Sequence, residues 1–133
     1  MPSASSISAS EEGAAPRIAV FGAGAIGSTL GGRLAEAGRD VVLIARGAHL
    51  AAMRDDGLVL EDPDGRARIA VRATDDPASA GPQDLVVFTV KAHQLAEAVA
   101  AAKPMLGPQT TVITAINGLP WWYFRGIGGD HEG

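Results

Sequence analysis

The sequence has 133 residues, 47% of them hydrophobic and 20% charged, a formal net charge of −4 at pH 7 and no cysteine. This length allows one domain with a hydrophobic core but is short for a two-domain enzyme. The acidic balance disfavours a nucleic-acid partner, and the lack of cysteine excludes disulfides and thiolate metal sites. No apolar run approaches the roughly 20 residues that cross a membrane. We therefore expect a cytoplasmic domain without a nucleic-acid or membrane partner.

The first fifteen residues are expected to form a disordered tail. They are mostly small or polar, include Glu11 and Glu12, and lack the basic and apolar regions of a secretory signal. Such residues bury too little surface to offset the entropy of ordering them. Residues 16–133 are then the ordered domain.

Apolar strand-like runs alternate with helically spaced segments along the rest of the chain. The expected strands are 17–21, 40–45, 84–90 and 110–116. The expected helices are 25–37, 47–56 and 93–103. A hairpin is expected between 58–61 and 68–72 around a turn at 62–65, and 74–82 is expected to be a polar connection. This order predicts an α/β fold with a Rossmann-like, doubly wound, mainly parallel sheet and helices on both faces.

A glycine-rich loop joins the first expected strand to the first helix. Its sequence is Gly22-Ala23-Gly24-Ala25-Ile26-Gly27, which matches the G-x-G-x-x-G pattern of dinucleotide-binding loops. Gly22 allows a tight turn, Gly24 lets the backbone approach a pyrophosphate, and Gly27 lets the helix lie close to the strand. The helix N-terminus then offers free N–H groups to the phosphates. Glycine is common here, at 17 of 133 residues, so a glycine-rich turn without a ligand is the alternative.

The end of the second expected strand predicts which dinucleotide binds. An acidic residue there would hydrogen-bond the ribose of NAD, but the chain has Arg46, followed by Gly47. A guanidinium can pair with the 2′-phosphate of NADP through two hydrogen bonds, so NADPH is the expected cofactor. The missing acid also disfavours S-adenosylmethionine. A solvated surface arginine is the alternative.

Two polar clusters follow the later strands. Lys91 and Gln94 come after the strand over 84–90, and Asn117 comes after the strand over 110–116. Ligands bind beyond the carboxyl ends of the strands in open α/β sheets, so these residues are expected near the nicotinamide. A solvated lysine and an Asn-Gly turn are the respective alternatives. His93 is left out of the site.

These segments together resemble the ketopantoate reductase (2-dehydropantoate 2-reductase) family. The resemblance runs from Arg17 to about Gly129. It is carried by four pieces: Gly22–Gly27, Val41–Gly47, Val90–Gln94 and Ala115–Phe124. The first piece is generic to Rossmann folds, whereas the Val-Lys-Ala-x-Gln and Asn-Gly segments at this separation are more specific.

The resemblance implies an NADPH-dependent reduction of 2-dehydropantoate, a 2-oxo acid, to (R)-pantoate for pantothenate biosynthesis. It implies that Gly22–Gly27 hold the pyrophosphate, Arg46 the 2′-phosphate, and Lys91 with Gln94 another part of the cofactor. Asn117 would lie near the nicotinamide and position the substrate. The family takes its general-acid lysine from a helical second domain, which we expect to be missing here. The chain is then a truncated cofactor domain, inactive alone, with no catalytic residue of its own.

Four consecutive aromatic residues, Trp121–Phe124, follow Asn117. Such a cluster is typical of a partner surface, either a second domain or a homodimer interface. No metal site is expected, because His49 and His131 have no partner at ligand spacing. The alternative functions are a non-catalytic NADP-binding module and the cofactor domain of another 2-oxo acid reductase.

Overall fold

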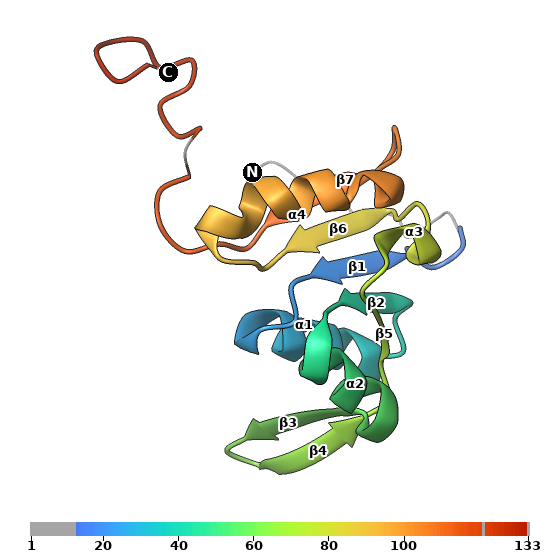
Figure 1. Cartoon of the computed structure of the whole chain (residues 1–133). Helices are drawn as coiled ribbons and strands as arrows, with labels where there is room; N and C mark the ends of the chain where they lie inside the picture. Colours follow the sequence, from blue (N-terminus) through green and yellow to red (C-terminus); the bar gives the residue numbers. More distant parts are fainter. Residues whose placement is uncertain (1–12, 121, 133) are drawn as a thin grey trace, which may run out of the picture.

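The computed structural model describes residues 13–120 and 122–132, and its centre is a parallel sheet. The sheet has five strands in the order β5-β2-β1-β6-β7 (Figure 1). The strands are Ile18–Phe21 (β1), Val41–Ile44 (β2), Arg72–Thr74 (β5), Leu85–Phe88 (β6) and Thr111–Thr114 (β7). Counting only these strands, the order is 3-2-1-4-5, as in a dinucleotide-binding half-sheet. The predicted Rossmann-like class is confirmed.

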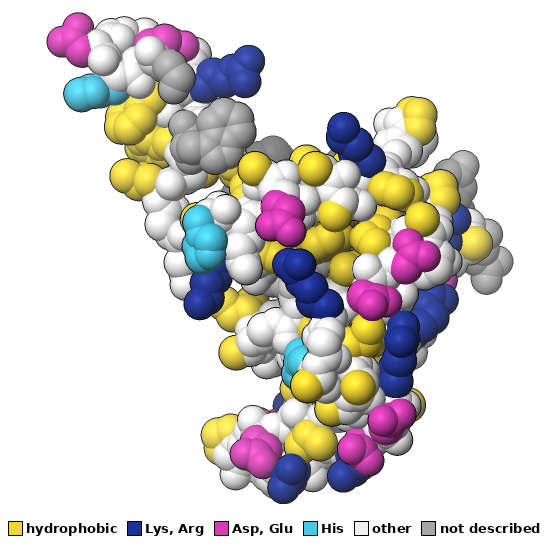
Figure 2. Space-filling view, viewed as in Figure 1, with side chains coloured by type: hydrophobic (Ala, Val, Ile, Leu, Met, Phe, Trp, Pro, Cys, Tyr) yellow, Lys and Arg dark blue, Asp and Glu magenta, His cyan; other side chains and the backbone are white. Residues whose placement is uncertain are grey.

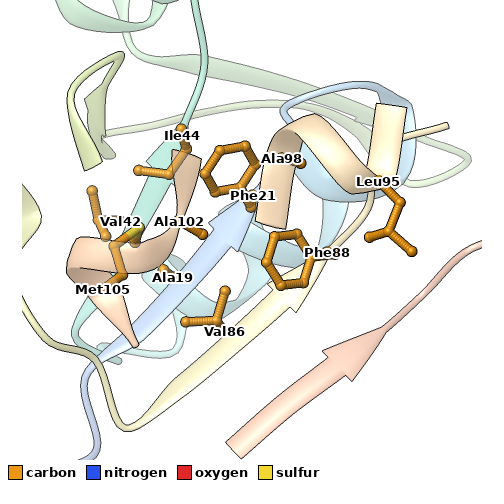
Figure 3. Close-up of a cluster of buried hydrophobic side chains, with 10 residues drawn as sticks. All are labelled: Ala19, Phe21, Val42, Ile44, Val86, Phe88, Leu95, Ala98, Ala102 and Met105. Carbon is orange, nitrogen blue, oxygen red and sulfur yellow. The ribbon is translucent and has the colours of Figure 1, made fainter. Parts of the chain in front are cut away.

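Helices cover both faces of the sheet because β1, β2 and β6 are apolar on both faces. Helix α1 (Ala25–Glu36) packs Leu30 and Leu34 against Ile18 and Val20. The other face packs against α4 (Leu95–Ala101), where Phe21 and Phe88 lie with ring centroids 5.5 Å apart. Figure 3 shows this second cluster, in which side chains of α4 and of the segment after it lie over the three strands.

A separate hairpin packs against α1 on the side of β2. Its strands, Leu58–Asp62 (β3) and Gly65–Ile69 (β4), are antiparallel and follow helix α2 (Gly47–Asp56). Gly32 of α1 allows this contact, because a Cβ there would lie 2.8 Å from the side chains of Leu58 and Leu60. Arg33 of the same helix forms ion pairs with Asp62 and Glu36. The predicted hairpin is confirmed, but its second strand is Gly65–Ile69 instead of 68–72, because Arg72 pairs with β2 in the main sheet.

Two short elements differ from the expectations. The segment 74–82, expected to be a polar connection, contains the end of β5 and the helix α3 (Pro77–Ala80). The helix expected over 93–103 is shorter and is flanked by 3₁₀ turns at Ala92–Gln94 and Lys103–Met105. Pro104 lies inside the second turn, and a proline has no N–H with which to continue an α-helix.

The C-terminal residues leave the sheet after β7 and project away from the domain (Figure 1). Trp122 is half-buried against the cluster around Phe88, whereas the side chains of Tyr123 and Phe124 are exposed and stack edge to face at 5.1 Å. Trp121 lies outside the described residues, as do residues 1–12 of the expected tail. No helix in the described part of the chain is long and apolar enough to cross a membrane.

Candidate functional site

The carboxyl ends of β1, β2 and β6 open into one cleft of about 330 Å³. This volume is within the range of small-molecule sites. The cleft lies where the strand order reverses between β1 and β6, the position at which open α/β sheets bind ligands. Its lining residues come from the glycine loop, the β2–α2 junction, the β5–α3 loop and the segment after β6. The polar and charged side chains among them are Arg46, His49, Asp75, Thr89, Lys91, Gln94 and Glu97.

At two positions of the loop, the fold itself leaves no room for a side chain. Gly22 has a φ of 111°, which L side chains rarely adopt, and a Cβ there would lie 2.9 Å from Cγ1 of Val90. A Cβ on Gly27 would lie 1.8 Å from the carbonyl oxygen of Gly22. The start of α1 therefore lies close to the end of β1, as the loop pattern predicts.

Gly24 has a different environment. Its φ is −70°, and a Cβ built there would meet no atom within 4 Å. Packing within the described residues therefore does not require glycine at this position, and Gly24 lines the cleft. Gly24 is the N-cap of α1 and offers no side-chain cap to the first-turn N–H groups. The loop thus fits a pyrophosphate, which needs both a close backbone approach and free N–H donors.

Hydroxyl groups hold the loop carbonyls from two sides. Thr89 Oγ1, just after β6, donates to the carbonyl oxygen of Gly22 at 2.6 Å. Ser28 Oγ in α1 is buried and donates to the carbonyl oxygen of Ala23 at 2.8 Å. Two successive carbonyl groups of the loop therefore have hydrogen-bond partners within the domain itself, and these bonds restrain the loop.

Arg46 stands at the far side of the cleft as the N-cap of α2. Its side chain is 77% exposed and lies 3.7 Å from the carboxylate of Glu97 on α4, measured from Nη1 to Oε1. His49, one turn into α2, also lines the cleft, and its Nε2 lies 3.4 Å from Ser28 Oγ. Figure 2 shows basic and acidic side chains adjoining on this face, between α4 and α2. The cleft therefore has an exposed guanidinium on its rim, which an anion in the cleft could contact.

Lys91 and Gln94 meet in the 3₁₀ turn after β6. The N–H of Lys91 donates to Oε1 of Gln94 at 3.4 Å, and the N–H of Gln94 donates to the carbonyl oxygen of Lys91 at 2.8 Å. Both residues line the cleft, and Lys91 forms no ion pair within residues 13–120 and 122–132. A lysine and an amide at this position can bind phosphate or hydroxyl oxygens of a nucleotide.

The structure brings most of the predicted residues together but not all of them. Gly22, Ala23 and Gly24 share the cleft with Arg46, Lys91 and Gln94. Ala25, Ile26 and Gly27 belong to the first turn of α1 and do not line it. Asn117 is exposed in the loop after β7, on the far side of β6 from Arg46, and does not line it either. No group of three His, Cys, Asp or Glu side chains suited to a metal was found among the described residues.

Four further cleft residues were not predicted from the sequence: His49, Asp75, Thr89 and Glu97. Thr89 lay inside the strand expected over 84–90 and lines the cleft because the strand ends at Phe88. Glu97 lies three residues beyond Gln94, in the first turn of α4. His49 and Asp75 enter the cleft only through the packing of α2 and β5, which no local pattern specifies.

Comparison with known proteins shows the family to which the chain belongs. The family model described as ketopantoate reductase PanE/ApbA matches residues 18–120, which include the glycine loop, Arg46, Lys91 and Asn117. The chain belongs to this ketopantoate reductase family. The resemblance inferred from the sequence pieces is thereby confirmed, and the protein family is one of oxidoreductases.

Several curated proteins and solved structures are similar to this chain over much of its length. The 2-dehydropantoate 2-reductase of Mesorhizobium japonicum is 48% identical over 118 residues, which cover 88% of this chain and 36% of the relative. The crystal structure of a PanE/ApbA family ketopantoate reductase from Ralstonia eutropha is 40% identical with a TM-score of 0.73, covering 77% of this chain and 34% of that chain. A D-mandelate dehydrogenase solved with NADH and anilino(oxo)acetate is 26% identical with a TM-score of 0.72, at the same coverage. The chain thus spans about a third of the length of these relatives.

Proposed function

We propose that this chain binds NADPH for the reduction of 2-dehydropantoate to (R)-pantoate, a step of pantothenate biosynthesis in the cytoplasm. The proposal is supported by one observation above all. Arg46 and Gly24, which has free space where a Cβ would stand, line the same cleft at the switch point of the sheet. The family supplies the reaction class, because relatives that match this domain are 2-dehydropantoate 2-reductases.

The proposed roles follow the chemistry of each group. The loop Gly22–Gly27 and the first turn of α1 bind the pyrophosphate through backbone N–H groups. Arg46 pairs with the 2′-phosphate, and Lys91 with Gln94 binds the cofactor beside β6. Asn117 lies near the nicotinamide and orients the 2-oxo acid. When bound, the nicotinamide supplies the hydride for the reduction.

Proton supply is proposed to lie outside these 133 residues. Reduction of a ketone needs a proton donor near the developing alkoxide, and in the family a lysine of the helical second domain takes this role. We assign no catalytic residue within 16–133, which we treat as the cofactor domain. The aromatic residues Trp121–Phe124 are proposed to contact a second domain or a second subunit.

A second candidate is the cofactor domain of another 2-oxo acid reductase. The observation in its favour is the similarity to a D-mandelate dehydrogenase that was solved with NADH. A non-catalytic NADP-binding module would share the cofactor site but reduce nothing. The choice between NADPH and NADH is therefore the first property to measure.

Substitution of Arg46 by Asp tests the proposed cofactor. The variant replaces the 2′-phosphate partner by a carboxylate that suits a ribose diol, so NADPH affinity is expected to fall about 100-fold, and NADH affinity less than about threefold. The measurement is a titration of the chain with each cofactor, followed by nicotinamide fluorescence. The matched control is Arg66→Asp, an exposed arginine on β4 far from the cleft, which should change neither affinity. Equal losses for the two cofactors in the Arg46 variant would make Arg46 an ordinary surface residue.

A further inference from the structure

The residue that faces Arg46 across the cleft is an acid. Glu97 lies on α4, on the opposite side of the cleft from α2, and its carboxylate is 3.7 Å from the Arg46 guanidinium. Both side chains line the cleft, and both are at least 75% exposed. The pair thus spans a site proposed for a polyanionic ligand.

The carboxylate of Glu97 would compete with the 2′-phosphate of NADPH for the guanidinium of Arg46. The 2′-phosphate carries a charge of about −1.5 to −2 near neutral pH and would use the same guanidinium N–H groups that now face Glu97. Binding of NADPH must therefore displace or share this ion pair, whereas NADH brings no phosphate to Arg46. Any repulsion between Glu97 and the pyrophosphate acts on both cofactors alike and cancels when they are compared.

We propose that Glu97 is a specificity-determining residue that competes with the 2′-phosphate for Arg46 and so lowers the preference of this chain for NADPH over NADH. The inference rests on the proposed function, because it takes Arg46 to be the phosphate ligand. It assigns to α4 a part in cofactor choice, in addition to the β2–α2 junction.

The other acid of the cleft has a different partner. Asp75, in the loop between β5 and α3, lies 3.9 Å from Nη2 of Arg54, whereas the ion-pair partner of Arg46 is Glu97. Its charge also lies in the cleft, so it tests whether any nearby carboxylate would act in the same way. A specific competition at Arg46 requires Glu97 to have the larger effect.

The size of the effect is limited by exposure. Exposed ion pairs are weak and are screened by salt, so removal of this one should change affinity by no more than about fivefold. Glu97→Gln is therefore expected to raise the ratio of the NADH to the NADPH dissociation constant about two- to fivefold at low salt. At about 1 M salt, where the Debye length is about 3 Å, the gain should shrink.

The experiment is a fluorescence titration of the 133-residue chain with NADPH and with NADH, for the wild type and five variants, one of which is Arg46→Ala alone. Glu97→Gln should raise the ratio, and Asp75→Asn should raise it less. Glu61→Gln removes the same charge from the hairpin, away from the cleft, and should leave the ratio unchanged. In the double variant Arg46→Ala with Glu97→Gln, the ratio should equal that of Arg46→Ala alone. The fold of each variant is checked by circular dichroism, and both charge-removing substitutions in the cleft are at exposed side chains.

The outcomes separate this inference from the function on which it rests. An unchanged or lower ratio in Glu97→Gln, an equal gain in Asp75→Asn, or a gain that persists without Arg46 overturns the role of Glu97 and leaves NADPH binding intact. If the wild type binds neither cofactor, or prefers NADH, the proposed function itself fails and this inference fails with it.

Discussion

The three glycines of the cofactor loop meet different demands. Gly22 and Gly27 are required by their neighbours, since a side chain at either would clash with Val90 or with the Gly22 carbonyl. Gly24 has open space around it and lines the cleft, so we attribute its lack of a side chain to the proposed approach of a pyrophosphate. A sequence pattern treats these positions as equivalent, whereas the structure separates the demands of folding from those of binding.

This separation predicts opposite phenotypes for two alanine substitutions. Gly24→Ala should change the free energy of unfolding by less than about 1 kcal/mol, because φ is −70° and nothing lies within 4 Å. It should nevertheless weaken NADPH about tenfold, because the new methyl group lies where the pyrophosphate approaches. Gly27→Ala should destabilise the domain by about 3 kcal/mol or more. The measurements are thermal unfolding and NADPH titration, and wild-type NADPH affinity in Gly24→Ala would remove the pyrophosphate from this loop.

At the scale of elements, local patterns predicted the main strands, α1, α2 and the hairpin, because each carries its own periodicity or turn residues. Strand β5 was missed, since its three residues, Arg72–Thr74, contain one apolar side chain and become a strand only by pairing with β2. Helix α3 has an Asp76 cap and Pro77 at its start, but four residues are too few for a periodic signal. The predicted cleft residues all lay on the loops after strands, whereas Glu97 and His49 reached the cleft through helix packing.

One contact between strand ends gives a pH-dependent prediction. The guanidinium of Arg17 before β1, together with the Arg17 backbone N–H at 2.8 Å, bonds the carboxylate of Asp84 before β6. The side-chain hydrogen bond is the larger cause, and together these donors hold the pKa of Asp84 below its usual value. A lowered folded-state pKa means that the contact stabilises the domain above the ordinary aspartate range and that this stability is lost as pH falls through the lowered pKa.

Replacing Asp84 by Asn should therefore lower the melting temperature slightly at pH 7. The difference from wild type should shrink as the pH falls below about 4, where the carboxylate of the wild type becomes protonated. Asp64→Asn, at the exposed tip of the hairpin turn, is the matched control, because this carboxylate forms no ion pair within the described residues. A difference that stays constant from pH 7 to acid would mean that charge plays no part in the contact.

At the scale of the whole molecule, the domain leaves apolar surface uncovered at one end. Strand β7 is the edge of the sheet, and its Val112 and Ile113 are 48% and 45% exposed, although parallel sheets are normally covered on both faces. The exposed Leu119 and Tyr123 follow it in the segment that projects from the domain. The described surface therefore offers contact area beside the strand end that carries Asn117, where the substrate is proposed to bind.

If the cofactor site lies in this chain and the proton donor lies outside it, the chain should bind NADPH without catalysing the reduction. The 133-residue chain should bind NADPH yet show no NADPH oxidation that depends on 2-dehydropantoate, because the proton donor is proposed to lie outside these residues. The assay follows NADPH absorbance with and without the substrate, and a complete homologous reductase is the positive control. Substrate-dependent oxidation by the purified chain would show that it contains its own general acid.

The most direct test of the proposed NADPH site is the ratio of the NADH to the NADPH dissociation constant for the unmodified chain. Nicotinamide fluorescence gives the affinities for NADPH and NADH in the same low-salt buffer. If Arg46 pairs with the 2′-phosphate beside the glycine loop, NADPH should bind at least about tenfold more tightly than NADH. Equal affinities, or tighter binding of NADH, would contradict the proposed pairing of Arg46 with the 2′-phosphate.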